Sequence, residues 1–404
     1  MKNYVRVPEI LMPKSADLQK WATVACDQFT AEPKYWQELE ALVGDAPSTL
    51  KITIPEIYLK ENLEKRIENA QTTMRQYLDG DFFRAIHGFV LVERQCGSET
   101  RVGLMVSIDL DAYDWNRVRV PFRATEDTIM SRLPVRVEMR KTAPIEVPHI
   151  LLLIDDDKKE IIEPLYENRE NLKKLYDFDL NMGGGHIRGY WVEDTEAVLT
   201  KFQNLLNPTE QIRKYGVDAG VLMAVGDGNH SIAAAKLIWE ERKKNLSPEE
   251  YETCPARYLL AEAVNLYGGG MEFEPIHRVV FTEDPTFLQK LQTSLHGVGK
   301  IKVLSEKGME YLNAPDKASI AIREIQKFLE AYQVAHPETE VDYIHGEGHL
   351  SEILEKRQGY GIVMPAFPRE ELFPYVMNVG NLPKKAFSIG EPEQKRYYME
   401  CKRI

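Results

Sequence analysis

The chain has 404 residues, of which 63 are acidic and 51 are basic, for a formal net charge of −12. This length suits two or three domains, and the acidic balance repels polyanions and argues against a nucleic-acid partner. Its four cysteines are widely spaced and no apolar run approaches the roughly 18 residues of a membrane span, so we expect a cytoplasmic protein without a membrane partner. The composition leaves a homo-oligomer open.

The first half of the chain alternates apolar runs with amphipathic segments. Residues 22–26 and 88–93 are predicted as buried strands, and apolar residues at three- and four-residue spacing predict a helix over 61–78. An arginine-rich stretch leads to an apolar strand at 149–154, and residues 163–176 are predicted as a helix. This alternation predicts an α+β class with α/β-like character.

The second half carries a buried strand at 220–225, a loop, and a helix that continues to about residue 244. We place a main α/β core at 1–275, which includes this loop. A C-terminal part at 276–404 follows, with a helical insert predicted at about 282–340 and later strands that pack back on the core.

The strongest functional signal is a loop of small and polar residues between the buried strand and the helix. Its members are Gly226, Asp227, Gly228, Asn229, His230 and Ser231. A strand that turns into a helix at glycine residues brings free N–H groups and the positive end of the helix dipole to one point, which favours an anion. Gly226 and Gly228 would allow close approach of a phosphate, and Asn229 and Ser231 would cap the helix or bind the phosphate.

Two residues of this loop are candidates for catalysis. Asp227 would hold Mg²⁺ or accept a proton, and His230 would contact the transferred phosphate or act as an acid or base. The alternative interpretation is an ordinary tight turn with an N-cap, because Asp, Gly, Asn and Ser are common in such connections. The loop matches neither the Walker A pattern nor the dinucleotide fingerprint, so the motif alone does not identify a reaction.

The loop and several other segments resemble one protein family along nearly the whole chain. These segments are Arg123-Ala-Thr-Glu-Asp-Thr, Pro148-His-Ile-Leu-Leu-Leu-Ile-Asp, Pro275-Ile-His-Arg, Asp342-Tyr-Ile-His-Gly-Glu and Lys395-Arg-Tyr-Tyr-Met-Glu-Cys. Together with the loop they resemble the DUF1015 family of bacterial and archaeal proteins.

The loop is also similar to the Asp-Gly-His-His-Arg loop of the free-serine kinases, whose core belongs to the ParB and sulfiredoxin superfamily. This resemblance implies a ParB/sulfiredoxin-like mixed-sheet core with added helical and strand subdomains, and a phosphotransferase activity. Asn229 stands in place of the first His and Ser231 in place of the Arg, so the loop lacks a cationic phosphate clamp. The difference leaves room for a smaller donor, such as pyrophosphate in place of ATP or ADP, held by other arginines.

Further candidate residues lie outside the loop. Asp27 follows the strand at 22–26, where a serine kinase would need a carboxylate to take the hydroxyl proton. Arg123 and Arg132 would clamp phosphate groups, and the alternative is that both pair with neighbouring carboxylates. Substrate contacts are predicted for Gln28, Glu126, His186 and His345.

The leading hypothesis is a small-molecule kinase that uses Mg²⁺ and transfers phosphate from a nucleotide or pyrophosphate to free L-serine or a similar metabolite. The alternatives are a regulatory protein that senses a nucleotide or phosphate ligand without turnover, and a phosphohydrolase. The kinase hypothesis requires that residues distant in sequence converge, above all Asp27, Arg123, His186 and Asp227.

Overall fold

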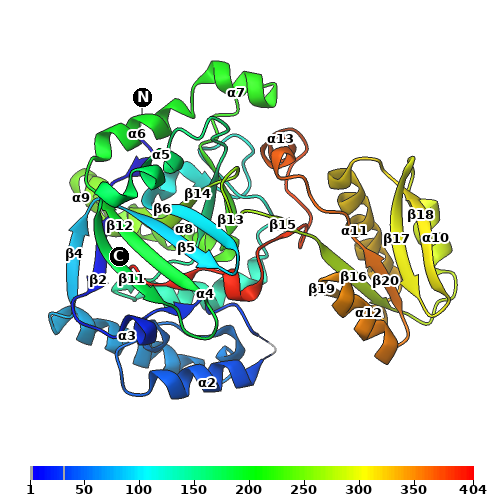
Figure 1. Ribbon diagram of the computed structural model, residues 1–404, viewed down its shortest axis with the longest axis horizontal. Helices are drawn as coiled ribbons and strands as arrows, with labels where there is room; N and C mark the ends of the chain where they lie inside the picture. The colour runs from blue at the N-terminus through cyan, green and yellow to red at the C-terminus, as the bar shows by residue number, and fades with distance from the viewer. Residues whose placement is uncertain (1–2, 31) are drawn as a thin grey trace. The chain divides into compact units, whose positions relative to one another are not determined.

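The computed structural model describes residues 3–30 and 32–404 (Figure 1). Its contacts divide the chain into two compact units. The first comprises Met1–Met271 and Glu391–Ile404, and the second comprises Glu272–Gly390. The chain therefore leaves the first unit, builds the second, and returns to the first for its last segment. The division predicted from the sequence, with a core at 1–275 and a C-terminal part at 276–404, stays a prediction.

A mixed sheet of ten strands in the described residues forms the centre of the first unit. Its path runs through β11 (Lys173–Asp179), β12 (His186–Val192), β5 (Phe89–Cys96), β6 (Glu99–Asp109), β14 (Tyr258–Asn265), β10 (Leu151–Ile154), β13 (Met223–Asp227), β8 (Phe122–Arg123) and β7 (Tyr113–Asp114), with β1 (Val5–Arg6) paired to β6. Strand β10 is parallel to β14 and antiparallel to β13. This mixed sheet and its helices confirm the predicted α+β class.

The side chains of this sheet alternate between two hydrophobic cores, one on each face. In β5, for example, Phe89 enters one core and Val90 enters the other. The first core is covered by α5 (Ile162–Glu167), α6 (Thr195–Asn204) and α8 (Asn229–Arg242), and the second by α2 (Pro33–Val43) and α3 (Leu63–Asp79). None of the helices in the described residues is long and apolar enough to cross a membrane.

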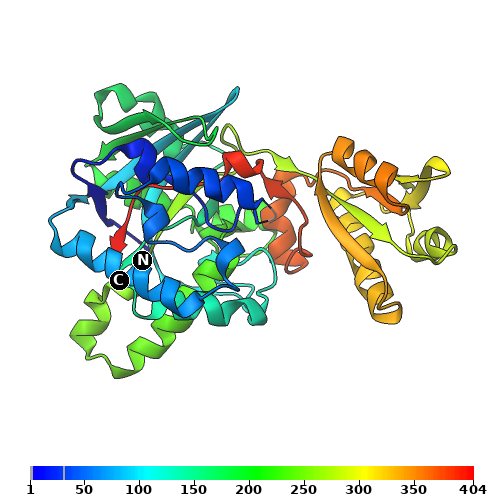
Figure 2. The same cartoon turned by 90° about the horizontal axis from the view of Figure 1, so that it is seen from below.

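Short strand pairs tie the C-terminal segment into the first unit, as Figure 2 shows from below. β22 (Tyr397–Tyr398) pairs with β3 (Thr23–Val24), and β23 (Lys402–Arg403) pairs with β9 (Ile145–Glu146). These pairings place the end of the chain beside the strand that precedes Asp27.

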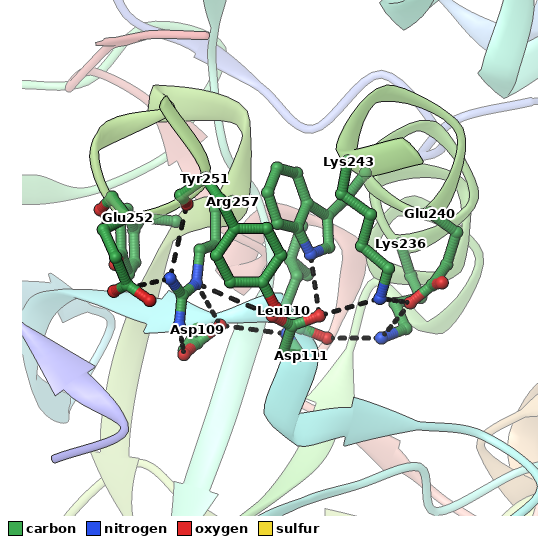
Figure 3. Close-up of polar contacts among 11 residues, drawn as sticks. Asp109, Leu110, Asp111, Lys236, Glu240, Lys243, Tyr251, Glu252 and Arg257 are labelled. Atoms are coloured by element: carbon green, nitrogen blue, oxygen red, sulfur yellow. Dashed lines mark hydrogen bonds and ion pairs between the residues drawn. The ribbon is translucent and has the colours of Figure 1, made fainter. Parts of the chain in front are cut away.

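Helix α8 is fixed to the end of β6 through its C-terminal half (Figure 3). The backbone carbonyl of Leu110 accepts a hydrogen bond from Lys236 Nζ at 2.8 Å. Asp111 Oδ1 accepts hydrogen bonds from Trp239 Nε1 at 2.9 Å and from Lys243 Nζ at 3.0 Å. These bonds fix the position of α8, and with it the position of the first turn at the N-terminal end of the helix.

The second unit has an antiparallel sheet of its own. Its strand order is β18 (Gly308–Ala314), β17 (Gly299–Ser305), β20 (Tyr360–Val363), β16 (Ile276–Phe281) and β19 (Glu340–His345). Its helices include α10 (Phe287–Ser294), α11 (Ala318–Ala335), α12 (Glu347–Lys356) and α13 (Leu372–Asn378).

Two helix predictions are wrong in part. The stretch 282–340 contains α10 and α11, but the β17–β18 hairpin lies between them, where Ile301 and Val303 are buried and alternate with more exposed residues. The helix predicted over 163–176 ends at Glu167, because residues further on pair as β11 with β12. In both segments, pairing with a partner strand outweighs the local helical pattern.

Candidate functional site

The predicted loop is very short, because β13 and α8 nearly meet. Gly226 lies inside β13, the strand continues to Asp227, and the helix begins at Asn229. Gly228, the single residue between them, has φ 83° and ψ 25° in the left-handed region. A Cβ atom at this position would lie 2.8 Å from Cγ1 of Ile150, so glycine is the residue that fits without a shift.

The first turn of α8 presents donors for an anion. The N–H groups of Ser231 and Ile232 donate to the Gly228 carbonyl at 3.0 and 3.1 Å. The N–H groups of Asn229 and His230 come earlier and have no acceptor within the helix. The first turn itself holds no acidic side chain, and the carboxylate of Asp227, just before the N-cap, is paired with Lys395. The backbone geometry of an anion site is therefore present.

Asp227 lies between this turn and the C-terminal segment. Its Oδ1 accepts a hydrogen bond from the Gly228 N–H at 2.8 Å, and its Oδ2 lies 3.3 Å from Lys395 Nζ. Burial alone would raise the pKa of Asp227, but the charges of Lys395 and His149 outweigh burial and lower that pKa. Asp227 is therefore an ionised carboxylate at neutral pH, with a cation beside it.

His149 connects the first turn of α8 to Tyr398. Its Nε2 lies 3.3 Å from Ser231 Oγ, and its Nδ1 lies 3.1 Å from the Tyr398 hydroxyl. That hydroxyl donates its hydrogen to Cys26 Sγ at 3.0 Å, so its oxygen accepts the Nδ1–H of His149. The other ring nitrogen, Nε2, lies within hydrogen-bond distance of the Ser231 hydroxyl group. His149 is thus a positioning residue for Ser231.

Asp27 faces the same ring nitrogen of His149. Its Oδ2 lies 4.0 Å from His149 Nε2, and its Oδ1 accepts a hydrogen bond from Gln28 Nε2 at 2.9 Å. A nucleophilic serine triad has its carboxylate and its serine on opposite nitrogens of the histidine. Here Asp27 and Ser231 share one nitrogen, so the arrangement does not support a serine nucleophile.

His230 is a neutral side chain in this structure. Its Nε2 accepts a hydrogen bond from the Ile129 N–H at 3.2 Å. Burial lowers the pKa of His230 to about 4, and the charges of Arg136 and Arg132 act in the same direction. The cations near the first turn of α8 are therefore arginine and lysine side chains rather than this histidine.

The segment that follows β8 runs beside β13. Arg123 is buried and lies opposite Ala224 in the parallel pair of β8 and β13. Two residues later, the Thr125 hydroxyl donates to the Val225 carbonyl at 2.7 Å, and Glu126 follows directly. The structure therefore places Arg123 and Glu126 next to the strand that ends at the loop, while their roles in binding stay predictions.

The other two histidines that are predicted as site residues lie elsewhere. His186 is in β12, five strand spacings from β13, which at about 4.8 Å for each spacing is roughly 24 Å. Its ring contacts Asp177 and Asp179, each at 2.6 Å. His345 belongs to the second unit, where it lies opposite Ile276. His186 therefore does not converge with the loop, and the substrate contact of His345 stays a prediction.

Three residues of this site, His149, Lys395 and Tyr398, are not among the site residues predicted from the sequence. The two segments that contain them are among those that resemble the family, and this resemblance is the one feature of the sequence that points to these residues. Their contacts join positions 82, 168 and 249 residues apart, which no local spacing reveals.

Magnesium fits this site only together with a phosphate ligand. Among residues 3–30 and 32–404, no group of three or more His, Cys, Asp or Glu side chains is arranged to hold a metal ion. Both carboxylate oxygens of Asp227 have partners, the Gly228 N–H and the Lys395 ammonium group. Mg²⁺ often binds through one or two carboxylates and the phosphates of a substrate, so the metal role predicted for Asp227 requires a bound donor.

Residues 9–361 match the model of a family described as a protein of unknown function, DUF1015. The chain belongs to the DUF1015 family. This match confirms the family predicted from the loop and its companion segments. No curated protein matches this DUF1015 chain.

Several solved structures are similar to this DUF1015 protein at low identity. A conserved hypothetical protein from Pyrococcus furiosus is 11% identical, with a TM-score of 0.34 over 74% of this chain and 90% of that chain. A free serine kinase in complex with AMP is 10% identical, with a TM-score of 0.38 over 74% of this chain and 87% of that chain. These scores are too low to support an argument about activity.

Proposed function

We propose that this DUF1015 protein is a small-molecule kinase that transfers a phosphoryl group from ATP, ADP or pyrophosphate to the hydroxyl group of a metabolite such as free L-serine. The observation that supports this best is that Asp27 and Lys395 both lie near the first turn of α8. An anion site, a carboxylate base and a cation are the parts that positioning and charge stabilisation require in phosphoryl transfer.

In this proposal the donor phosphates bind at the first turn of α8. The N–H groups of Asn229 and His230 donate to the phosphate oxygens, as helix N-termini commonly do. Lys395 supplies the positive charge that the loop itself lacks, because Ser231 stands where the resembling loop has an arginine. Arg132, whose charge acts on His230, adds further positive charge near this turn.

Asp27 activates the acceptor. Its carboxylate takes the proton of the acceptor hydroxyl as the oxygen attacks the terminal phosphorus of the donor. The Nε2 atom of His149 contacts Ser231 and faces Asp27. The histidine ring therefore occupies one side of the space next to Asp27 and limits where the acceptor can bind. Mg²⁺ would arrive with the donor, shield the charge of its phosphates and contact Asp227.

The finer fold assignment belongs to the same proposal. A ParB/sulfiredoxin-like core would place the donor on a strand, loop and helix like those formed by β13, Gly228 and α8. The resemblance of the loop to that of the free-serine kinases supports this assignment.

Mass spectrometry of the purified chain tests the proposal. The protein is incubated with Mg²⁺ and a pool of amino acids and polyols, with ATP, ADP or pyrophosphate in separate tubes. We expect one phosphorylated acceptor and a matching loss of one donor. Retention of a donor without turnover would instead indicate a sensor, and release of inorganic phosphate without any acceptor would indicate a phosphohydrolase.

A further inference from the structure

A cavity of about 160 Å³ lies directly beside the proposed acceptor position. Asp27, His149, Ser231 and Tyr398 line part of it. Asp27 and Ser231 lie near His149 Nε2, and Tyr398 lies near His149 Nδ1. The wall of the cavity therefore includes the candidate base and part of the first turn of α8. A molecule in this cavity can present a hydroxyl group to Asp27.

Much of the remaining wall is hydrocarbon. It includes the side chains of Ile52, Ile54, Leu59, Met74, Met139 and Ile145. Apart from Asp27 and His149, the charged side chains in the wall form ion pairs with each other, Arg136 with Glu56 at 3.3 Å and Arg140 with Glu146. The body of a ligand in this cavity therefore meets mainly apolar atoms and paired charges.

Volume and lining together define the ligand. An apolar cavity of about 150 Å³ accepts a molecule the size of benzene, so about six to eight non-hydrogen atoms fit here. Free serine has a suitable size, but its carboxylate would find the arginines of the wall already paired with Glu56 and Glu146, and its ammonium group would compete for Asp27, the proposed base. Burial of an unpaired charge is strongly unfavourable. A hydrocarbon body suits the same walls, because its burial is favourable.

We infer that this cavity is the acceptor subsite and that it takes a hydroxyl compound with a hydrocarbon body of about four to six carbon atoms. The inference rests on the proposed kinase function and specifies its acceptor class. During transfer the hydroxyl proton passes to the Asp27 carboxylate, and the acceptor oxygen forms a bond to the terminal phosphorus. The bond between that phosphorus and the bridging oxygen breaks, and the rest of the donor leaves as ADP, AMP or phosphate.

Binding and turnover are measured separately. Calorimetry gives the Kd of the full chain for L-serine, for primary alcohols from propan-1-ol to hexan-1-ol and for benzyl alcohol. Mass spectrometry then follows phosphorylation of the same compounds with Mg²⁺ and each donor. We expect affinity to rise about fourfold for each added methylene group until the cavity is full, and we expect L-serine to bind more weakly than pentan-1-ol.

Two variants test whether the alcohols occupy this cavity. Met139→Trp fills it, so alcohol binding should weaken at least tenfold while pyrophosphate binding stays unchanged. Ile54→Ala enlarges the cavity and should shift the preference toward longer alcohols. This variant provides a second test if circular dichroism shows that the tryptophan variant is misfolded. The control is Met309→Trp, at a side chain that is 55% exposed in the second unit.

Tighter binding of L-serine than of every alcohol would overturn this acceptor class. So would alcohol binding that neither cavity variant changes. A different result would contradict the kinase proposal alone. In that case the alcohols would bind with the expected dependence on Met139 and Ile54, but no compound would become phosphorylated.

Discussion

Lys395 Nζ and Asp227 Oδ2 lie 3.3 Å apart, although 168 residues separate them in the sequence. Two buried arginines support this contact. Arg94 and Arg101 lie opposite each other on β5 and β6, and their guanidinium groups donate to the backbone carbonyls of residues 393–395 at 2.8 to 3.4 Å. They fix the backbone next to the lysine and so determine where its ammonium group lies.

Replacement of Lys395 by Met should weaken donor binding by about ten- to a hundredfold, because a charge-assisted contact to phosphate is lost from a partly buried site. Calorimetry with pyrophosphate and with ADP measures this change. Lys60→Met removes an exposed lysine and is the matched control. If the native chain and both variants bind the donor with the same affinity, Lys395 is not part of the donor site.

Replacement of Asp27 by Asn should lower kcat by at least about a hundredfold, which is the usual contribution of a general base. The amide keeps the shape of the side chain and its contact with Gln28, so the Kd of the donor should stay the same. Single-turnover kinetics with saturating donor separate the chemical step from binding. A variant with normal kcat would show that another group takes the acceptor proton.

The α+β class, the family and the loop could be predicted because each depends on local sequence. The run of apolar residues that ends at Val225 forms a strand, and the glycine at 228 allows the left-handed turn into α8. Asp27 is singled out as well because it directly follows the apolar residues 22–26, and its role as a base stays a prediction.

The partners of these residues could not be predicted, because chain segments far apart in sequence supply them. His149 reaches Ser231 only after β10 and β13 have paired, and Lys395 reaches Asp227 only after the chain has returned from the second unit. His186 illustrates the opposite error. Its glycine-rich context suggests a ligand contact, but sheet order places it five strands away, between two aspartates.

Protonation of His230 should destabilise the protein. The pKa of this histidine is about 4 in the folded chain against an ordinary value of 6.5, so its folded state favours the neutral ring. Its contribution to stability is present above pH 6.5 and is lost as the pH falls from 6.5 toward about 4. At about pH 5 the loss should be about 1 to 2 kcal/mol after allowance for solvent screening.

Urea unfolding at about pH 8 and about pH 5 checks this difference. His230→Gln keeps an acceptor for the Ile129 N–H and does not titrate, so it should lose less stability than the native chain over the same interval. A variant with the same pH dependence as the native chain would assign the effect to other groups.

Replacement of Asp111 by Asn should destabilise the anchor of α8. Burial alone would raise the pKa of Asp111, but hydrogen bonds from Tyr251, Trp239 and Lys243 outweigh it and lower the pKa to about 2. The carboxylate therefore stabilises the fold above its ordinary pKa of 3.8, and this contribution is lost as the pH falls through about 2. The difference between the two pKa values corresponds to about 2 kcal/mol at neutral pH.

The Asp111→Asn variant connects this anchor to the proposed donor site. At pH 7 its free energy of unfolding should be lower by about 2 kcal/mol, and the difference from the native chain should narrow as the pH falls below about 4. Because Asp111 holds Trp239 of α8 and Lys243 at its C-cap, a shift of the helix should also displace its first turn and weaken pyrophosphate binding several-fold. Asp45→Asn changes an exposed carboxylate and should leave both measurements unchanged. A loss of stability without a change in pyrophosphate affinity would show that the first turn keeps its position independently of this anchor.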